Sequence, residues 1–504
     1  MTDRINEHIK IYIEARKKIL ALRYALWLME YDYKTSMPKA NHAYYKIQVR
    51  QLTKNIEELM ITSSFTESIE FLFLNKALLD ADLQTEINLS YHSIHQTTKI
   101  SADLVKEYNE VLATANEFKD KAIEKDDFSI FLPVLEKIVA YHRNLIKVNE
   151  TDIIKGYDVI LNTYLDKVYV KRYDEIFDEL DKNLLEYTHE VITKTPNIRK
   201  RLREIPCKIE KQKKLNEHWL KVFRVDLEKC RWKQSEYLFS SGFSSTDVRF
   251  TTTFSDYNFL KNYQTFIREI GSTLYEQQND PRFDNTFLHG KASLSLSESQ
   301  KRLYSNFIGR DYKFWYANYD KVVSIFDKEL RYISVDFFYD YINSIEFTTM
   351  IEEADELTYW LHVRVRYEME KALFNEGYPV KKLPELWKKL TRKYLGVTSK
   401  TLEASFLQDA TWANGEFGYF PTSLLGSLYA AQFLNQMRKD LDYKKNIKEN
   451  NIEPMNAWLK ENVHCYGKSK LPLEILLLAT KEKLNIDYYI KYLRKKYSYY
   501  IENF

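Results

Sequence analysis

Glycine and proline are scarce in this chain of 504 residues, which contains 11 glycines and 10 prolines. At about 2% each, both are well below the roughly 7% and 5% found in average proteins. Because these two residues punctuate turns, their scarcity favours long helices over many short strands.

Cysteines and long apolar runs are also scarce. The three cysteines, Cys207, Cys230 and Cys465, are far apart and odd in number, which excludes a readable disulfide framework or zinc knuckle. No apolar run reaches the ~18 residues that a membrane helix needs, and the N-terminus has no apolar signal-peptide core. We therefore expect a cytoplasmic protein in a reducing compartment, with no membrane partner.

No excess of one charge sign is present. The chain has 75 basic and 72 acidic residues, a net charge of +3, so nothing global indicates binding to nucleic acid. Residues 193–221 are locally basic, but their apolar spacing and interleaved glutamates suit a solvated helix face better. We expect no nucleic-acid partner.

Amphipathic helix is what the chain has in abundance. Residues 5–32, 101–125 and 171–194 carry apolar side chains three and four apart, and Ser101 is a suitable N-cap. Residues 245–254 instead alternate Val, Phe and Thr, which predicts a strand. With no repeat or linker visible, we expect a mainly α fold, a single large helical domain over 1–504 with a small β-sheet. Its helical N-terminal half covers roughly 1–230 and its second half roughly 231–504.

The segment REIGSTLYEQ, residues 268–277, is similar to the metal-binding pattern H-E-x-x-H-x-L-Y-E-Q. Two histidines at i and i+4 lie on one helix face and bind one ion, while the glutamate beside the first activates a metal-bound water. Here Arg268 and Ser272 stand at the histidine positions, whereas Glu269 is intact.

Seven segments in all resemble one family, the Taq-type zinc carboxypeptidases, over nearly the whole chain. They are YDYKTSMP (31–38), TDVRFTT (246–252), REIGSTLYEQ (268–277), SLSESQKRLYSNFIGRDYKFW (295–315), MIEEADELTYWLHVRVRYEME (350–370), FLQDATWANGEFGYFPTSLLGSLYAAQ (406–432) and WLKENVHCYG (458–467). The resemblance implies an almost wholly helical fold with a long central groove, and a small sheet beside that groove and beside the former active-site helix. It also implies zinc-dependent removal of C-terminal residues from peptides, and homodimers.

The resemblance also implies roles for single residues. The third metal ligand, in the family's H-E-S-Q segment, falls on Glu298, and the general base falls on Glu269, here vestigial. Candidates for the substrate groove, from D-x-R-x-T, L-Q-D and G-Y-F-P, are Asp247, Arg249, Gln408, Asp409 and Tyr419.

Other functional positions of the family are changed. A histidine is replaced by Ser297 and another by Thr411, an arginine by Ile351, a tyrosine by Ser423, and H-P-F appears as Ser241-Gly242-Phe243. The packing residues around these positions survive, which indicates that the fold was kept while the chemistry was given up.

No substitute zinc site is readable. The ten histidines include no i,i+4 pair, and His92 and His95, three apart, suit a polar helix face. Glu269 and Glu298 alone would hold at best a weakly bound hard cation. We therefore expect no cofactor, and zinc only if replacement ligands exist. We further predict that Arg268 pairs with Glu298 in place of the ion, and that Ser272 and Ser297 fill space and make hydrogen bonds.

Three functions stay open. The first is a pseudoenzyme that binds a peptide or a protein C-terminus in the groove, as a homodimer or as a heterodimer with a family paralogue. The second is an enzyme with altered, metal-independent chemistry that uses Glu269. The third is a residual metallocarboxypeptidase with non-standard ligands. Metal analysis separates the third from the others, and a peptide-hydrolysis screen separates the second from the first.

Overall fold

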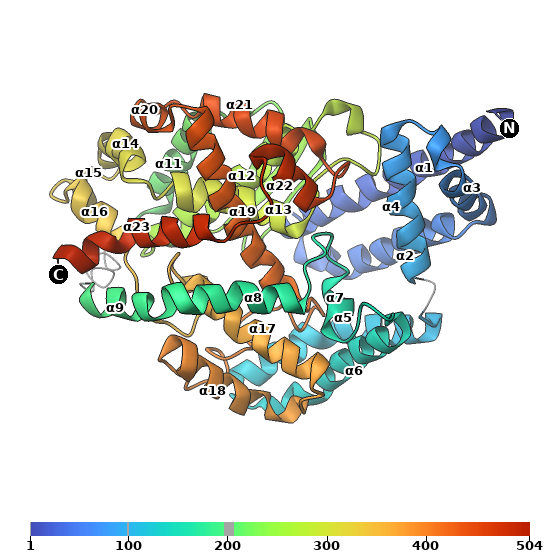
Figure 1. Ribbon diagram of the computed structural model, residues 1–504, viewed down its shortest axis with the longest axis horizontal. Coiled ribbons are helices and arrows are strands. Elements are labelled where there is room, and N and C mark those ends of the chain that lie inside the picture. Colours follow the sequence, from blue (N-terminus) through green and yellow to red (C-terminus); the bar gives the residue numbers. More distant parts are fainter. Residues whose placement is uncertain (1, 98–99, 196–205, 504) are drawn as a thin grey trace.

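Helices make up most of the computed structural model, which describes residues 2–97, 100–195 and 206–503 (Figure 1). The prediction of a mainly helical fold with one small sheet is confirmed. Nowhere in these described ranges is a helix long and apolar enough to cross a membrane.

The first helix, α1 (Thr2–Thr35), links two parts of the molecule. Ile5, Tyr12 and Ile19 are buried at seven-residue intervals, so they lie on one face of the helix and pack on the helices that follow. Further along, Trp27 and Tyr31 are buried one turn apart against Phe239 of the sheet region. The predicted helix over 5–32 is therefore confirmed.

The first four helices enclose an apolar cluster of their own, on the right of Figure 1. After α1 these helices are α2 (His42–Met60), α3 (Ser63–Leu74) and α4 (Ala81–Thr97). The much larger second cluster contains residues from Ala115 to Tyr497. The presence of separate apolar clusters does not test the prediction of a single domain over 1–504, or of its division near residue 230. Both stay predictions.

The larger cluster is built by the remaining helices of the described chain. Before the sheet these are α5 (Ala102–Glu124), α6 (Leu132–Asn149), α7 (Tyr157–Leu161), α8 (Val170–Leu180), α9 (Glu186–Lys194) and α11 (Ile209–Val222). After the sheet they are α12 (Phe259–Gln277), α13 (Leu294–Arg302), α14 (Tyr312–Ile325), α15 (Asp327–Leu330), α16 (Val335–Ile342), α17 (Tyr359–Asn375), α18 (Leu383–Leu395), α19 (Tyr419–Asp440), α20 (Tyr443–Lys448), α21 (Glu453–Asn462), α22 (Pro472–Thr480) and α23 (Asp487–Asn503).

Two more of the predicted helices are confirmed. Residues 101–125 form α5, whose N-cap Ser101 accepts a hydrogen bond from the backbone N–H of Leu104 at 3.3 Å. Residues 171–194 form α8 and α9, joined by a π-helical turn at Asp181–Leu185. Residues 196–205, which include Pro196 and belong to the basic stretch 193–221, lie outside the described residues.

The sheet has three strands, β1 (Cys230–Gln234), β2 (Ser240–Ser244) and β3 (Asp247–Thr252), in the order β1-β3-β2. β3 pairs in parallel with β1 and antiparallel with β2, and the register shifts between Gly242 and Ser244. The predicted strand over 245–254 is β3. Both β2 and β3 pack against α12, so the sheet lies beside this helix as predicted.

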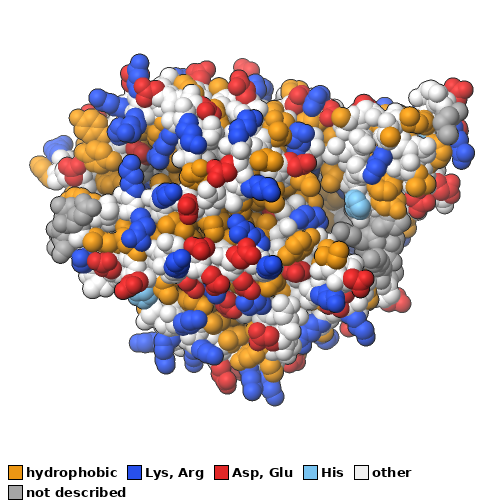
Figure 2. Space-filling view, viewed as in Figure 1, with side chains coloured by type: hydrophobic (Ala, Val, Ile, Leu, Met, Phe, Trp, Pro, Cys, Tyr) orange, Lys and Arg blue, Asp and Glu red, His pale blue; other side chains and the backbone are white. Residues whose placement is uncertain are grey.

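The surface carries both charge signs. Lys and Arg side chains alternate with Asp and Glu over the face in Figure 2, in keeping with the net charge of +3. The predicted lack of a nucleic-acid partner is not tested by this and stays a prediction. The long central groove likewise stays a prediction.

Candidate functional site

α12 is buried on nearly every side. From Phe266 to Glu276 each residue is buried except Arg268, whose side chain keeps 30% of its surface exposed. A helix buried all round must satisfy its polar side chains internally. Ser272 does so by accepting a hydrogen bond from the hydroxyl of Ser240 on β2 at 3.0 Å, which confirms the prediction that it makes a hydrogen bond. Glu276 pairs with Lys291 at 2.6 Å.

α13 lies between α12 and α19, and two glycines allow close contact on both sides. A Cβ on Gly271 of α12 would be 2.5 Å from the carbonyl oxygen of Gln300. A Cβ on Gly426 of α19 would be 2.7 Å from the Cβ of Glu298. Both distances are too short for any side chain, so glycine is needed at each position. The result is that α13 packs at backbone distance against both α12 and α19, with the Cβ of Glu298 beside Gly426.

The guanidinium of Arg268 binds the carboxylate of Glu298. Its Nη2 donates a hydrogen bond to Oε2 of Glu298 at 2.8 Å, while only 2% of the Glu298 side chain is exposed. The predicted Arg268–Glu298 pair is thus confirmed. A charge-assisted bond of this kind offsets part of the desolvation of a buried carboxylate.

Two more cations reach Glu298 from its own helix. Lys301 Nζ lies 3.4 Å from Oε1 of Glu298 and 3.9 Å from Oε1 of Glu269. Arg302 Nη2 lies 3.5 Å from Oε2 of Glu298. We call Arg268, Glu269, Glu298, Lys301 and Arg302 the charged cluster.

Lys301 was missed by sequence reasoning, although a signal was present. It occupies the second serine position of the family pattern H-E-S-Q-S-R, and its place three residues after Glu298 puts it on the same helix face. A basic residue introduced next to a retained acidic position indicates a new ion pair.

The charges of the cluster shift the pKa values of Glu298 and Tyr419. Burial alone would raise the pKa of Glu298, but the positive charges of Arg268, Lys301 and Arg302 outweigh burial and hold this pKa well below its usual range. The negative charge of Glu298, followed by burial, raises the pKa of Tyr419 well above its usual value. Glu298 is therefore an anion and Tyr419 a neutral hydroxyl near neutral pH.

Positive charge exceeds negative charge in the cluster. Three cations face the two carboxylates Glu298 and Glu269, which leaves one positive charge over. Oε2 of Glu269 is buried and accepts no hydrogen bond from any described residue. The vestigial-base role of Glu269 stays a prediction.

Neutral groups complete one side of the cluster. Ser423 of α19 lies 2.9 Å, oxygen to oxygen, from the hydroxyl of Tyr359, and it accepts a hydrogen bond from Arg302 at 3.3 Å. The Arg302 guanidinium stacks on the Tyr359 ring, 3.9 Å from its centre. These contacts hold Arg302 in place, with 6% of its side chain exposed.

Two of the predicted groove residues lie on β3 and contact each other and α1. Asp247 and Arg249 pair with each other on β3 through hydrogen bonds of 2.9 and 2.7 Å. The Arg249 guanidinium also stacks on Trp27 and Tyr31 of α1, 4.8 and 5.2 Å from the ring centres. The pair therefore fastens the sheet to α1, and its role in a groove stays a prediction.

Gln408 and Asp409 organise a loop. Gln408 accepts a hydrogen bond from the backbone N–H of Ile351 at 2.5 Å and donates to the carbonyl of Thr349 at 2.9 Å. Asp409 pairs with Arg366 at 3.2 Å and accepts hydrogen bonds from the N–H and hydroxyl of Thr411. Tyr419, another of the five predicted groove residues, is electrostatically coupled to Glu298 of the charged cluster.

The charged cluster is a poor fit to a divalent metal ion. Glu298 stands at the family's third ligand position, and three cations already surround its carboxylate. Elsewhere in the described ranges there is no group of three or more His, Cys, Asp or Glu side chains able to hold a metal ion. His92 packs edge-on against Phe73, and the side chain of His95 lies outside the described residues.

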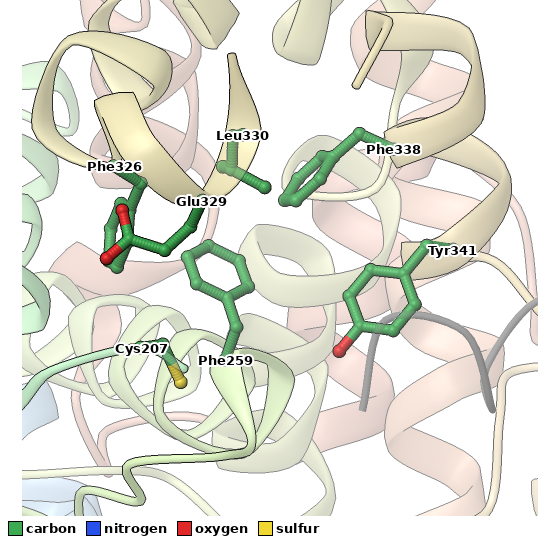
Figure 3. Close-up of a pocket in the computed structure, with 7 residues that line it drawn as sticks. All are labelled: Cys207, Phe259, Phe326, Glu329, Leu330, Phe338 and Tyr341. Atoms are coloured by element: carbon green, nitrogen blue, oxygen red, sulfur yellow. The ribbon is translucent and has the colours of Figure 1, made fainter. Parts of the chain in front are cut away.

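A separate hollow lies where α12 begins, beside α15 and α16 (Figure 3). Phe259, Leu330 and Phe338 point into it, so its lining is mainly apolar. Its one carboxylate, Glu329, pairs with Lys211 at 2.7 Å. We assign it no chemistry, because its charged group is already neutralised.

The fold is that of a known class of helical metallopeptidases. A structure of Pyrococcus furiosus carboxypeptidase is similar, with a TM-score of 0.93 and 27% identity over 97% of this chain and 99% of that one. A structure of Trypanosoma cruzi metallocarboxypeptidase 1 matches with a TM-score of 0.90 and 25% identity over 98% and 99%.

Sequence comparison identifies the family. Carboxypeptidase 1 of Bacillus subtilis is 33% identical over 98% of this chain and 99% of its own length. The family model described as carboxypeptidase Taq (M32) metallopeptidase matches residues 12–497. This chain belongs to that family.

Proposed function

We propose that this chain is a catalytically inactive member of its family that serves as a binding or partner protein. The proposal rests above all on the ion pair between Arg268 and Glu298. In the alignment of patterns, Arg268 stands at the first histidine ligand and Glu298 at the third ligand. A cation that is part of the protein thus takes the role of the metal ion in balancing Glu298.

The electrostatics support a metal-free site. A zinc ion beside Glu298 would have to approach Arg268, Lys301 and Arg302, all within 3.5 Å of that carboxylate. Repulsion between like charges at such distances amounts to several kcal/mol, even in a partly hydrated site. Zinc prefers nitrogen and sulfur ligands, and Ser272 supplies neither.

The loss of the metal removes the step that Glu269 would serve. A general base in such a site takes a proton from a metal-bound water, whose pKa the ion lowers to about 7. Without an ion, the water stays near its ordinary pKa, and a carboxylate alone is too weak a base for rapid attack on a peptide bond. Glu269 is then a remnant of the catalytic site.

The partner follows from the family by analogy. We propose that the chain binds a peptide or a protein C-terminus, works in the cytoplasm, and assembles as a homodimer or with an active paralogue. The preserved packing around α12, α13 and α19 supports retention of the family's surface without its chemistry.

Metal analysis and a peptide-hydrolysis screen test the proposal together. Protein purified in zinc-containing buffer and passed through gel filtration should hold far less than one zinc per chain. It should also leave C-terminal residues uncleaved on a broad set of peptides. Carboxypeptidase 1 of Bacillus subtilis, treated in the same way, is the matched positive control. Stoichiometric zinc that survives mild chelation, or turnover comparable to the control, would overturn the proposal.

A further inference from the structure

We propose that Arg268 and Lys301 form a binding site for one carboxylate group, so that a site for a cation has become a site for an anion. This inference rests on the proposed function, because a zinc ion and an anion cannot occupy the same place. The ligand class is a small organic monocarboxylate, either free or at the end of a peptide.

Both cations have hydrogen-bond donors to spare. Within the described chain Arg268 donates one hydrogen bond, through Nη2 to Glu298, although a guanidinium carries five N–H groups. Lys301 lies within ion-pair range of Glu298 and Glu269 but donates a hydrogen bond to neither. The remaining N–H groups of these two cations can donate to a ligand. Hydrogen bonds from a cation to an anion are stronger than those to a neutral acceptor.

These two cations are also the ones that a ligand can reach. The side chain of Arg268 keeps 30% of its surface exposed and that of Lys301 19%, whereas Arg302 keeps 6%. Arg302 is also occupied by Ser423 and the Tyr359 ring. A ligand entering from solvent therefore contacts Arg268 and Lys301 and leaves the inner ion pairs in place.

The charge balance selects the kind of anion. The cluster has one positive charge in excess, so a monoanion neutralises it, whereas a phosphate near −2 would leave it negative. A carboxylate also matches the planar fork of a guanidinium better than a spherical anion does.

Hippurate and its neutral amide, hippuramide, provide the test, since the two differ only in the carboxylate. Calorimetric titration at low ionic strength should show binding of hippurate, with hippuramide weaker by about tenfold or more. A third titration, with acetate, distinguishes a site for a free carboxylate from a site for the carboxylate at the end of a peptide. If acetate competes with hippurate the carboxylate suffices, and if not, the acyl-glycine portion contributes.

Variants assign the site. Arg268→Gln and Lys301→Ser should each weaken hippurate binding by about tenfold or more, because each removes a charge-assisted contact. Lys313→Ser, at an exposed position on α14, removes a lysine outside the cluster and should change nothing. A single cooperative thermal transition, well above the titration temperature, establishes that each variant is folded.

Each contrary result has its own meaning. Equal affinity for hippurate and hippuramide, or no saturable hippurate binding at millimolar concentration, overturns the carboxylate site. Full hippurate binding by both Arg268→Gln and Lys301→Ser overturns it as well. None of these results touches the proposed lack of catalysis, which the zinc and hydrolysis measurements decide on the same preparations.

Discussion

Arg268 on α12 and Glu298 on α13 are 30 positions apart in the chain, and their side chains meet at 2.8 Å. The pair joins the two helices at the place where the family resemblance puts a shared metal ion. A covalently attached cation has one property that an ion lacks, since it cannot dissociate. Several measurable consequences follow from that permanence and from the charges around it.

Chelation should leave the stability unchanged. Because no metal-binding free energy is coupled to folding, the melting temperature in excess EDTA should equal that in buffer. The control is EDTA already saturated with calcium, measured by differential scanning calorimetry in the same scan series. A fall of several degrees with free EDTA alone would reveal a structural ion.

Acid should weaken the protein partly through Glu298. The folded pKa of Glu298 lies below its ordinary value, so its contribution to stability is full above roughly pH 4.5 and is lost as the pH falls below it. Glu298→Gln should cost about 3 kcal/mol at pH 7 and less at pH 3. Urea denaturation at both pH values measures this. Glu107→Gln, at an exposed position on α5, is the control, and equal losses at both pH values would contradict the assignment.

Glu370 should give the opposite pH dependence. Burial raises its pKa to about 7, although it accepts hydrogen bonds from Tyr157, Trp412 and the N–H of Gly418. Between roughly pH 4.5 and 7 the folded state keeps a proton that the unfolded state has lost, so stability falls as the pH rises. Relative to wild type, Glu370→Gln should flatten this fall by up to about 3 kcal/mol. If the free energy of unfolding of Glu370→Gln changes with pH as it does in wild type and in the control Glu107→Gln, the assignment to Glu370 is wrong.

Zinc binding should be recoverable by substitution. Arg268→His with Ser272→His restores two ligands at i and i+4, with Glu298 as the third. Lys301 still lies 3.4 Å from Glu298, so adding Lys301→Ser should raise zinc affinity further, by about tenfold or more. Elemental analysis and competition with a zinc indicator measure both steps. A folded triple variant without zinc would show that the backbone has left metal-binding geometry.

Activity should return later than the metal. The double variant Arg268→His with Ser272→His should turn over very slowly, since each missing transition-state contact can lower the rate by ~10²-fold or more. Adding Ile351→Arg, Thr411→His, Ser297→His and Ser423→Tyr should raise the rate of C-terminal residue release above that of the double variant. Equal rates in the two variants would contradict the assigned positions.

Local patterns in the sequence were enough for the elements that build the site. The helix over 5–32 has apolar side chains three and four apart, and the strand over 245–254 alternates with a period of two. Both are found in the structure, as α1 and β3. The pair of Arg268 and Glu298 was also predictable, because two ligands of one ion must be neighbours. These predictions needed only residues close in sequence or tied by one shared function.

Other features depend on packing that no local pattern encodes. Lys301 comes within 3.9 Å of Glu269 only because of how α13 packs against α12, and Arg302 stacks on a ring from α17. The perturbation of Glu370 arises from full burial near Tyr157, more than 200 positions away. The separate apolar cluster of α1 to α4 is likewise a property of the assembled chain.

Gly271 and Gly426 allow α13 to pack closely on α12 and α19 whichever chemistry the site carries. Because α13 touches both neighbouring helices at backbone distance, these two glycines permit its position whichever side chains stand at 268, 272, 297 and 301. We therefore expect side chains at those four positions to be replaceable without a shift of the helices that carry them. A protein engineer can therefore vary them together as one library, and each variant reports on its own chemistry with the architecture held constant.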